Sequence, residues 1–235
     1  MPHIDIPGSV SVTTVLKVLN KPYLNKWVAK HSLTKMMAYL EHAGEETGHP
    51  IGEEVLKKHG LKQEEFWQDA EALGKKAAER GTAGHAEVEE INVGFILGEE
   101  GDVKPKTQIQ QAYYGFLFEE QFQVIHAEDP FVNKELGLHG TPDAIFLRDG
   151  KYFVPDYKFT NRLYPEIALQ QAGYSLLETR FCDATGIAIR FGELKKTGWK
   201  MYEPIYYNLA AYQDDFLALL RIYKRFYANG QHGKL

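Results

Sequence analysis

Two acidic residues and one lysine stand close together in the segment GTPDAIFLRDGKYFVPDYKF. Asp143 opens one stretch rich in β-branched and aromatic residues, and Asp156 and Lys158 lie in the next. The turn at residues 148–150, Arg-Asp-Gly, predicts an antiparallel hairpin that folds Asp156 back toward Asp143. Because residues two apart on a strand point to the same side, we expect the Asp156 carboxylate and the Lys158 amine to lie together.

Two carboxylates beside one amine form the smallest set of groups that can hydrolyse a phosphodiester. Carboxylates are hard oxygen ligands for Mg²⁺ or Mn²⁺, and such an ion neutralises the charge that develops on the phosphate and lowers the pKa of bound water. We expect burial and the nearby metal to depress the pKa of Lys158. The amine would then orient or deprotonate the attacking water.

An Asp-x-Lys triplet alone is expected by chance about once in a chain of this length, so neighbouring residues must support the prediction. Upstream of the triplet, Glu128 ends a predicted strand. Functional groups are positioned well on regular elements. We therefore favour Glu128 as a further acidic ligand, with Glu119 or Glu120 as the alternative.

Three polar residues on predicted helices complete the candidate site. Gln170 and Tyr174 lie one turn apart on the helix that follows the triplet. They either support the site or pack in an amphipathic helix, and Gln171 leaves a one-residue uncertainty in the register. His85, four residues after Gly81, either joins the site or is an ordinary helix histidine paired with a neighbour.

Helical spacing of apolar residues dominates the first hundred residues, and strand-like stretches begin near residue 122. The expected helices are one capped by Ser11 or Thr13 that ends before Pro22, others in PYLNKWVAK and LTKMMAYLEHAG, one carrying Phe66 to Ala77, and one from Glu79 to about Leu97. The later elements are strands in FQVIHAE, GTPDAIFLRDG and KYFVPDYKF, a helix over about 166–179, a hairpin from ATGIAIRFG to WKMYEPIYY, and a closing helix from Asn208 to Asn229-Gly230. This order predicts an α+β (mixed α/β) fold with a central mixed sheet flanked by helices and a helical N-terminal region.

The composition suits one buried core, with 235 residues, 44% hydrophobic and 25% charged. We expect a single domain over residues 1–235, with a mainly helical region at 1–103 and a core at 104–235. The chain has no run of about 18 apolar residues and its first residues do not form a secretory signal. We therefore expect a soluble cytoplasmic protein that makes no membrane contact.

The single cysteine, Cys182, excludes an intramolecular disulfide and any iron–sulfur or zinc site that needs several thiolates. A metal in this chain must be held by oxygen and imidazole groups. The net charge of -5 gives no support for nucleic-acid binding, because contact with phosphate depends on Lys and Arg. Basic residues collect over 21–30 and 190–200, so the sequence is still compatible with a local basic groove.

The order of these motifs resembles the RecB-like branch of the PD-(D/E)XK nucleases, and within it the phage exonucleases and the mitochondrial genome maintenance exonuclease group. The resemblance spans most of the chain. It rests on PGSVSVTTVLKVL with LNKWVAK, on RGTAGHAEVE, on QVIHAEDPFVNKELGLHGTPD, on VPDYKFT and on LQQAGYSLL. The implied fold is a restriction-endonuclease-like sheet flanked by helices.

The resemblance also implies a metal centre that binds Mg²⁺ or Mn²⁺ and has no iron–sulfur cluster. The implied metal ligands are His85, Asp143, Asp156 and the carbonyl of Tyr157, with Glu128 at the metal or its water. Lys158 would be the catalytic lysine, and Gln170 and Tyr174 would hold the site or contact DNA.

The implied activity is that of a DNA exonuclease acting on single-stranded or frayed ends in replication, recombination or repair. The alternatives are a structure-dependent endonuclease and a catalytically silent DNA-binding or assembly module on the same fold. The sequence contains no helicase motif, so any motor would belong to a protein partner in replication or recombination.

Overall fold

The computed structural model describes residues 6–19, 63–160, 162–194 and 198–226. The chain divides into two compact units, one of residues 1–19 with 81–235 and the other of residues 20–80. Helix α4 (Gln63–Ile96) runs through the boundary, and its first part is all that is described of the second unit. The sheet and every candidate site residue lie in the first unit.

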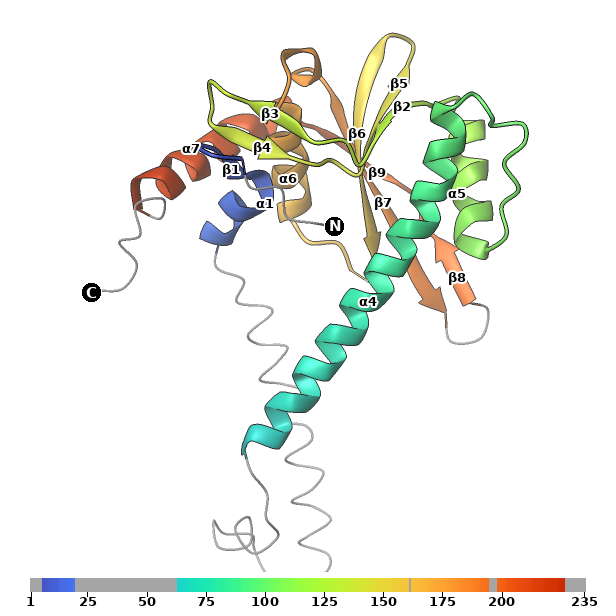
Figure 1. Cartoon of the computed structure of the whole chain (residues 1–235), viewed down its shortest axis with the longest axis horizontal. Coiled ribbons are helices and arrows are strands. Elements are labelled where there is room, and N and C mark those ends of the chain that lie inside the picture. The colour runs from blue at the N-terminus through green and yellow to red at the C-terminus, as the bar shows by residue number, and fades with distance from the viewer. Residues whose placement is uncertain (1–5, 20–62, 161, 195–197, 227–235) are drawn as a thin grey trace, which may run out of the picture. The chain divides into compact units, whose positions relative to one another are not determined.

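A mixed β-sheet forms the centre of the first unit, in the strand order β2-β5-β6-β7-β8, and β9 also pairs with β7 (Figure 1). Strands β6 and β7 are parallel, and all other neighbours in this sheet are antiparallel. The strands are β2 (Gln123–Ala127), β5 (Ala144–Arg148), β6 (Lys151–Phe159), β7 (Thr185–Leu194), β8 (Gly198–Met201) and β9 (Ile205–Asn208). The predicted mixed sheet is confirmed.

Both predicted hairpins form. Asp149 and Gly150 join β5 to β6 with φ values of 51° and 72°, and positive φ at both turn residues matches the twist of a two-residue hairpin. Strand β8 pairs with the second half of β7, and β9 returns to pair with its first half. Strands β6 and β7 bury most of their residues, as expected for parallel strands covered on both faces.

Helices cover both faces of this sheet, and each face has its own cluster of buried apolar side chains. On one face, α6 (Glu166–Ser175) and α7 (Ala210–Phe226) pack with Ile145 of β5. On the other face, α5 (Gln108–Glu119) and the end of α4 pack with Phe146, the next residue of β5. Figure 1 shows these two helical layers on opposite sides of the sheet. The predicted α+β class, a mixed sheet flanked by helices, is confirmed.

A second, three-stranded sheet lies beside the first helix, and the sequence did not predict it. Strands of two or three residues are too short to display a period of alternation. Of the two predicted caps, Ser11 is the one observed, since its side chain accepts a hydrogen bond from the Thr14 N–H. The short elements are β1 (Val10–Ser11), α1 (Val12–Val15), the 3-10 helices η1 (Leu16–Val18) and η2 (Thr179–Phe181), β3 (Phe131–Asn133) and β4 (Leu138–Gly140).

Three helices differ from expectation. The two helices predicted on either side of residue 79 are one continuous helix, α4, which accommodates the glycines of RGTAGH. Helix α5 was not predicted, although Thr107 caps it by accepting a hydrogen bond from the Gln110 N–H. Helix α6 ends at Ser175, short of the predicted end near residue 179. The predicted helices in PYLNKWVAK and LTKMMAYLEHAG and the stop at Asn229-Gly230 lie outside the described residues.

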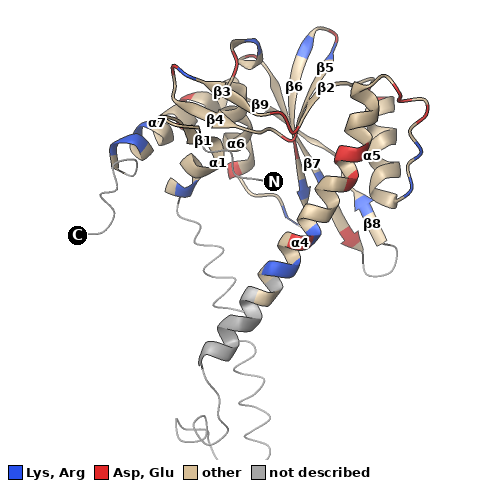
Figure 2. Ribbon diagram, viewed as in Figure 1, with Lys and Arg blue, Asp and Glu red and all other residues tan. Residues whose placement is uncertain are grey.

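Lys and Arg residues are spread over several described elements, among them α4, β8 and α7 (Figure 2). The basic stretch at residues 21–30 lies outside the described residues. In the other basic stretch, the Arg190 guanidinium lies 3.7 Å from the centre of the Tyr202 ring. No described helix is long and apolar enough to cross a membrane.

Candidate active site

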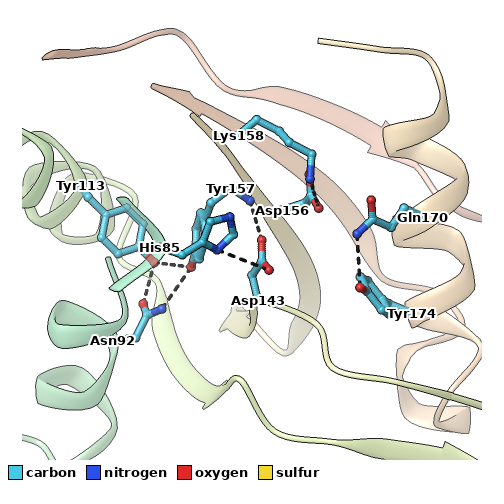
Figure 3. A network of polar contacts seen from close by, with 9 residues as sticks. All are labelled: His85, Asn92, Tyr113, Asp143, Asp156, Tyr157, Lys158, Gln170 and Tyr174. Carbon is cyan, nitrogen blue, oxygen red and sulfur yellow. Dashed lines mark hydrogen bonds and ion pairs between the residues drawn. The ribbon is translucent and has the colours of Figure 1, made fainter. Parts of the chain in front are cut away.

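The ladder of hydrogen bonds between β5 and β6 stops where the candidate site begins. Its last paired residues are Phe146 and Phe153, and Pro155, further along β6, has no N–H to donate. The next N–H on that side of β6 belongs to Tyr157, and it donates to the Asp143 carboxylate over 2.7 Å (Figure 3). The Asp143 side chain thus accepts the hydrogen bond that a strand partner would otherwise accept, and this fixes it at the opening between the strands.

A close approach of α4 to β6 places His85 beside Asp143. Gly84 lies against the Phe159 ring, where an added Cβ would be 2.3 Å from ring carbons. His85 Nδ1 lies 3.7 Å from Asp143 Oδ1. The imidazole packs against the rings of Tyr157 and Phe159, with centroid separations of 5.9 and 5.3 Å. The glycine before His85 is therefore the residue that lets α4 carry the imidazole into the site.

Glu128 reaches the same place from the end of β2. Its φ of 54° lies in the left-handed region, which is strained for a residue with a side chain. A hydrogen bond of 3.2 Å from its N–H to the Asp143 carbonyl holds this bend. One ligand atom from each of His85, Glu128 and Asp143 lies within 4.8 Å of the others. The structure therefore brings three of the predicted ligands together from three separate segments.

This cluster concentrates negative charge at a partly buried place. Burial, followed by the charges of Asp143 and Glu89, raises the pKa of Glu128 to about 7. Glu89 lies one helical turn beyond His85 on α4. The ionised form of Glu128 is thus disfavoured in the free chain, and a bound cation would relieve the repulsion.

Asp156 and Lys158 form an ion pair, as the strand spacing predicts. Lys158 Nζ lies 2.7 Å from Oδ1 and 2.6 Å from Oδ2 of Asp156. The Asp156 side chain is 1% exposed, and that of Lys158 is 27% exposed. The contact with Oδ1 has hydrogen-bond geometry, whereas Oδ2 has no hydrogen-bond partner among the described residues. Oδ2 therefore retains an acceptor position that another cation can use.

The prediction that the pKa of Lys158 is lowered is wrong for the chain without a bound metal. Burial lowers this pKa, but the charges of Asp156 and Asp143 outweigh burial and raise it above its ordinary value. Burial raises the pKa of Asp156 above its ordinary value, against the opposing effect of Lys158. Burial and a nearby metal would both lower the pKa of Lys158, but without a metal the two carboxylates together stabilise the charged amine.

The donor set fits a hard divalent cation, with Asp156 as a neighbouring rather than a converging ligand. Carboxylate oxygens and one imidazole are suitable ligands for Mn²⁺, and the carboxylates for Mg²⁺. Asp156 is not among the three groups whose ligand atoms converge. Its pKa nevertheless responds to the charges of Asp143 and His85, so it lies near them. The Tyr157 carbonyl, which the resemblance implies as a ligand, belongs to the same segment of β6.

Gln170 and Tyr174 form a polar pair on α6. Gln170 Nε2 donates to the Tyr174 hydroxyl over 3.2 Å (Figure 3). Tyr174 is buried beneath Gly140, where an added Cβ would be 2.9 Å from its ring. Burial, followed by the charge of Asp143, raises the pKa of Tyr174 above its ordinary value. The ring therefore has a packing role, while its hydroxyl is close enough to sense the charge of the site.

The alternative residues have other places in the structure. Gln171 is fully buried, and its amide donates to one backbone carbonyl of β6 and one of β7. Gln171 therefore connects α6 to the sheet by hydrogen bonds. Gln170, not Gln171, is the glutamine that contacts Tyr174. Glu119 is exposed at the end of α5, and Glu120 is paired with Arg148.

Asn92 and Tyr113, which the sequence did not assign to the site, contact Tyr157 on the side of β6 that faces α4 and α5. Asn92 on α4 and Tyr113 on α5 hydrogen-bond to each other and to the Tyr157 hydroxyl (Figure 3). All three are buried. Asn92 stands two turns after His85 on the same helix face, and this spacing is the one signal in the sequence that could have identified it.

Comparisons with known proteins leave the family of this chain open. A scan against protein-family models found no match, and a search of curated proteins found none. Among solved structures, the chain is similar to one described as "Crystal structure of SSO0001", with 13% sequence identity and a TM-score of 0.37, over 95% of this chain and 79% of that one. A likeness of this degree carries no argument about function.

Proposed function

We propose that this chain is a Mg²⁺- or Mn²⁺-dependent DNA nuclease that hydrolyses phosphodiester bonds and resembles the RecB-like PD-(D/E)XK nucleases in its site. The observation that supports this best is the meeting of His85, Glu128 and Asp143, whose ligand atoms lie within 4.8 Å of one another. These residues come from α4, the end of β2 and the start of β5. The Asp156 and Lys158 pair lies on β6, the strand next to β5, and also supports the proposal.

Each residue has a proposed role in this reaction. The groups that would hold the ion are His85, Glu128, Asp143, Asp156 and the Tyr157 carbonyl. When bound, the ion would neutralise charge on the phosphate and lower the pKa of its water. Lys158, with its partly exposed amine, would orient the attacking water and hold a proton next to it. Gln170 and Tyr174 would keep this side of the site in place or contact DNA.

We propose DNA with single-stranded or frayed ends as the substrate, cut from the end. Cleavage would take place in the cytoplasm during replication, recombination or repair. A partner protein would supply any motor that the reaction requires. The order of the motifs supports this part of the proposal. The site geometry supports the metal and the hydrolysis.

A cleavage assay tests the proposal. Labelled single-stranded oligonucleotides incubated with the protein and Mg²⁺ or Mn²⁺ should yield short products, and EDTA should prevent their formation. A flat time course with both metals, together with measurable DNA binding, would instead favour the silent module. Covalently closed single-stranded circles should stay intact, because an exonuclease needs an end; their cleavage would indicate an endonuclease.

A pair of matched variants connects the activity to this site. Asp143→Asn keeps an acceptor for the Tyr157 N–H and removes the charge, so it should abolish cleavage while the protein stays folded. Glu119→Gln makes the same chemical change at an exposed carboxylate and should leave cleavage unchanged. Equal activity in the two variants would place the reaction elsewhere in the chain.

A further inference from the structure

We propose that Tyr113 and Asn92 are positioning residues of the metal centre, and that they act through Tyr157. Neither residue is one of the three converging ligands His85, Glu128 and Asp143. The inference rests on the proposed function, because it concerns how the same centre is held in place. It gives a role to the Tyr157 side chain, which the Asp-x-Lys motif leaves unspecified.

The three side chains form a closed ring of hydrogen bonds. The Tyr113 hydroxyl donates to Asn92 Oδ1 over 2.6 Å, and Asn92 Nδ2 donates to the Tyr157 hydroxyl over 3.2 Å. The two hydroxyl oxygens are 2.6 Å apart. Because Tyr113 gives its one proton to Asn92, Tyr157 must donate to Tyr113. Each group in the ring then donates once and accepts once, so the orientation of all three is determined.

Tyr157 connects this ring to two of the candidate ligands. Its backbone N–H donates to Asp143 Oδ2 over 2.7 Å. Its aromatic ring and the His85 imidazole pack in a T-shaped arrangement with a centroid separation of 5.9 Å. A shift or rotation of Tyr157 would therefore move the hydrogen bond that holds Asp143 and the surface against which His85 rests.

The ring also fixes how α4 lies on the sheet. Asn92 and His85 are seven residues apart on α4, so they lie two turns apart on one face of the helix. The ring hydrogen-bonds Asn92 to β6 through Tyr157 and to α5 through Tyr113. Sliding or rotating α4 would break these hydrogen bonds. They therefore set the position of His85 along the sheet.

Packing in the apolar core does not explain why residues 113 and 157 carry hydroxyl groups. The Tyr113 and Tyr157 rings already pack edge to face, with centroids 5.4 Å apart, inside a cluster of apolar side chains. Phenylalanine at either position would keep the ring contact and avoid the cost of burying a hydroxyl. The hydroxyl groups instead fix the orientation of the Tyr157 side chain. That orientation matters because Tyr157 contacts the candidate ligands Asp143 and His85.

Isothermal titration of the protein with Mn²⁺ tests this inference. Tyr113→Phe and Tyr157→Phe each remove one hydroxyl and keep the ring, so each should weaken Mn²⁺ binding by about tenfold or more, the usual effect of a residue that supports a metal ligand. Leu220→Val, a buried change on α7 in the opposite helical layer, should lower the melting temperature and leave Mn²⁺ affinity unchanged. A variant that only loses stability should keep its Mn²⁺ affinity, whereas loss of a positioning residue should lower that affinity.

A double-mutant cycle shows whether Tyr113 acts through His85. In a His85→Ala background, Tyr113→Phe should weaken Mn²⁺ binding less than it does alone, because the ligand that it positions is gone. If both hydroxyl variants bind Mn²⁺ as tightly as Leu220→Val does, the positioning role is overturned and the metal centre stands. If the unmodified chain does not bind Mn²⁺, the proposed metal centre fails and the inference fails with it.

Discussion

Lys158 Nζ lies within 2.7 Å of both carboxylate oxygens of Asp156, a side chain that is only 1% exposed. A buried carboxylate is costly without a countercharge, and in the free chain Lys158 supplies that charge. A divalent cation bound at Asp156 would take over part of this role. Lys158 therefore contributes to the stability of the free chain as well as to the proposed chemistry.

Removal of this amine should affect both properties. Lys158→Ala should reduce turnover by orders of magnitude, and with metal chelated it should lower the free energy of unfolding by roughly 1–3 kcal/mol. This is less than the cost of breaking a fully buried pair, because the lysine is partly exposed. Urea unfolding in EDTA measures the second effect. Lys151→Ala, at an exposed lysine of the same strand, is the control, and equal stability of the two variants would contradict the countercharge role.

The raised pKa of Glu128 predicts that the free chain loses stability as pH rises. The pKa is 4.5 in the unfolded chain and about 7 in the folded one, so the folded state gains relative stability from protonation, fully below 4.5 and not at all well above 7. Glu128→Gln should therefore melt at the same temperature as the unmodified chain in acid. Solvent screens this partly exposed carboxylate and reduces the effect to roughly 1 kcal/mol, so at pH values above the folded pKa and in EDTA the variant should melt higher by about 2–4 °C.

Melting curves across this pH range, recorded in EDTA, measure the effect. Glu119→Gln removes an exposed carboxylate and should show no such divergence from the unmodified chain. Addition of Mn²⁺ should reverse the order, because the unmodified chain keeps the carboxylate ligand and gains more from the ion. A Glu128→Gln variant that is less stable than the unmodified chain at high pH in EDTA would contradict the crowding of negative charge around this residue.

A histidine exchange tests whether the imidazole on α4 is a ligand. His85→Ala should weaken Mn²⁺ binding by at least about tenfold, because it removes one of three converging donors. His126→Ala, at a histidine paired with Asp129, should leave the affinity unchanged. Thermal shift on addition of Mn²⁺ gives an independent measurement. Equal shifts for both variants would exclude His85 from the centre.

Two glycines on α4 provide a matched test of the helix position. Gly84→Ala would place a methyl group 2.3 Å from the Phe159 ring, so it should destabilise the chain by about 1–3 kcal/mol and weaken Mn²⁺ binding by displacing His85. The methyl group of Gly81→Ala would meet no atom of the described residues within 4 Å outside the adjoining helix backbone, so this variant should stabilise the helix by roughly 0.5–1 kcal/mol. Chemical unfolding and metal titration of both variants check this. A stabilising effect of Gly84→Ala would mean that α4 does not depend on the close approach.

Parts of the candidate site follow from local sequence. The turn residues and the alternation of the flanking strands specify the β5–β6 hairpin, because two-residue turns and a strand period of two are short-range properties. The meeting of Asp156 and Lys158 follows from that period. The fold class follows from the order of helical and strand-like segments, whereas the three-residue strands are too short to show a pattern.

Other parts depend on contacts between distant segments, which spacing alone does not contain. The sequence names His85, Glu128 and Asp143 as candidates, but their convergence requires the close approach of α4 to β6 and the left-handed bend at Glu128. The Lys158 pKa rises rather than falls because the fold places two carboxylates around one amine, and electrostatic interactions depend on distance in space. Asn92 and Tyr113 acquire their role only when three separate elements bring their polar groups together in the core.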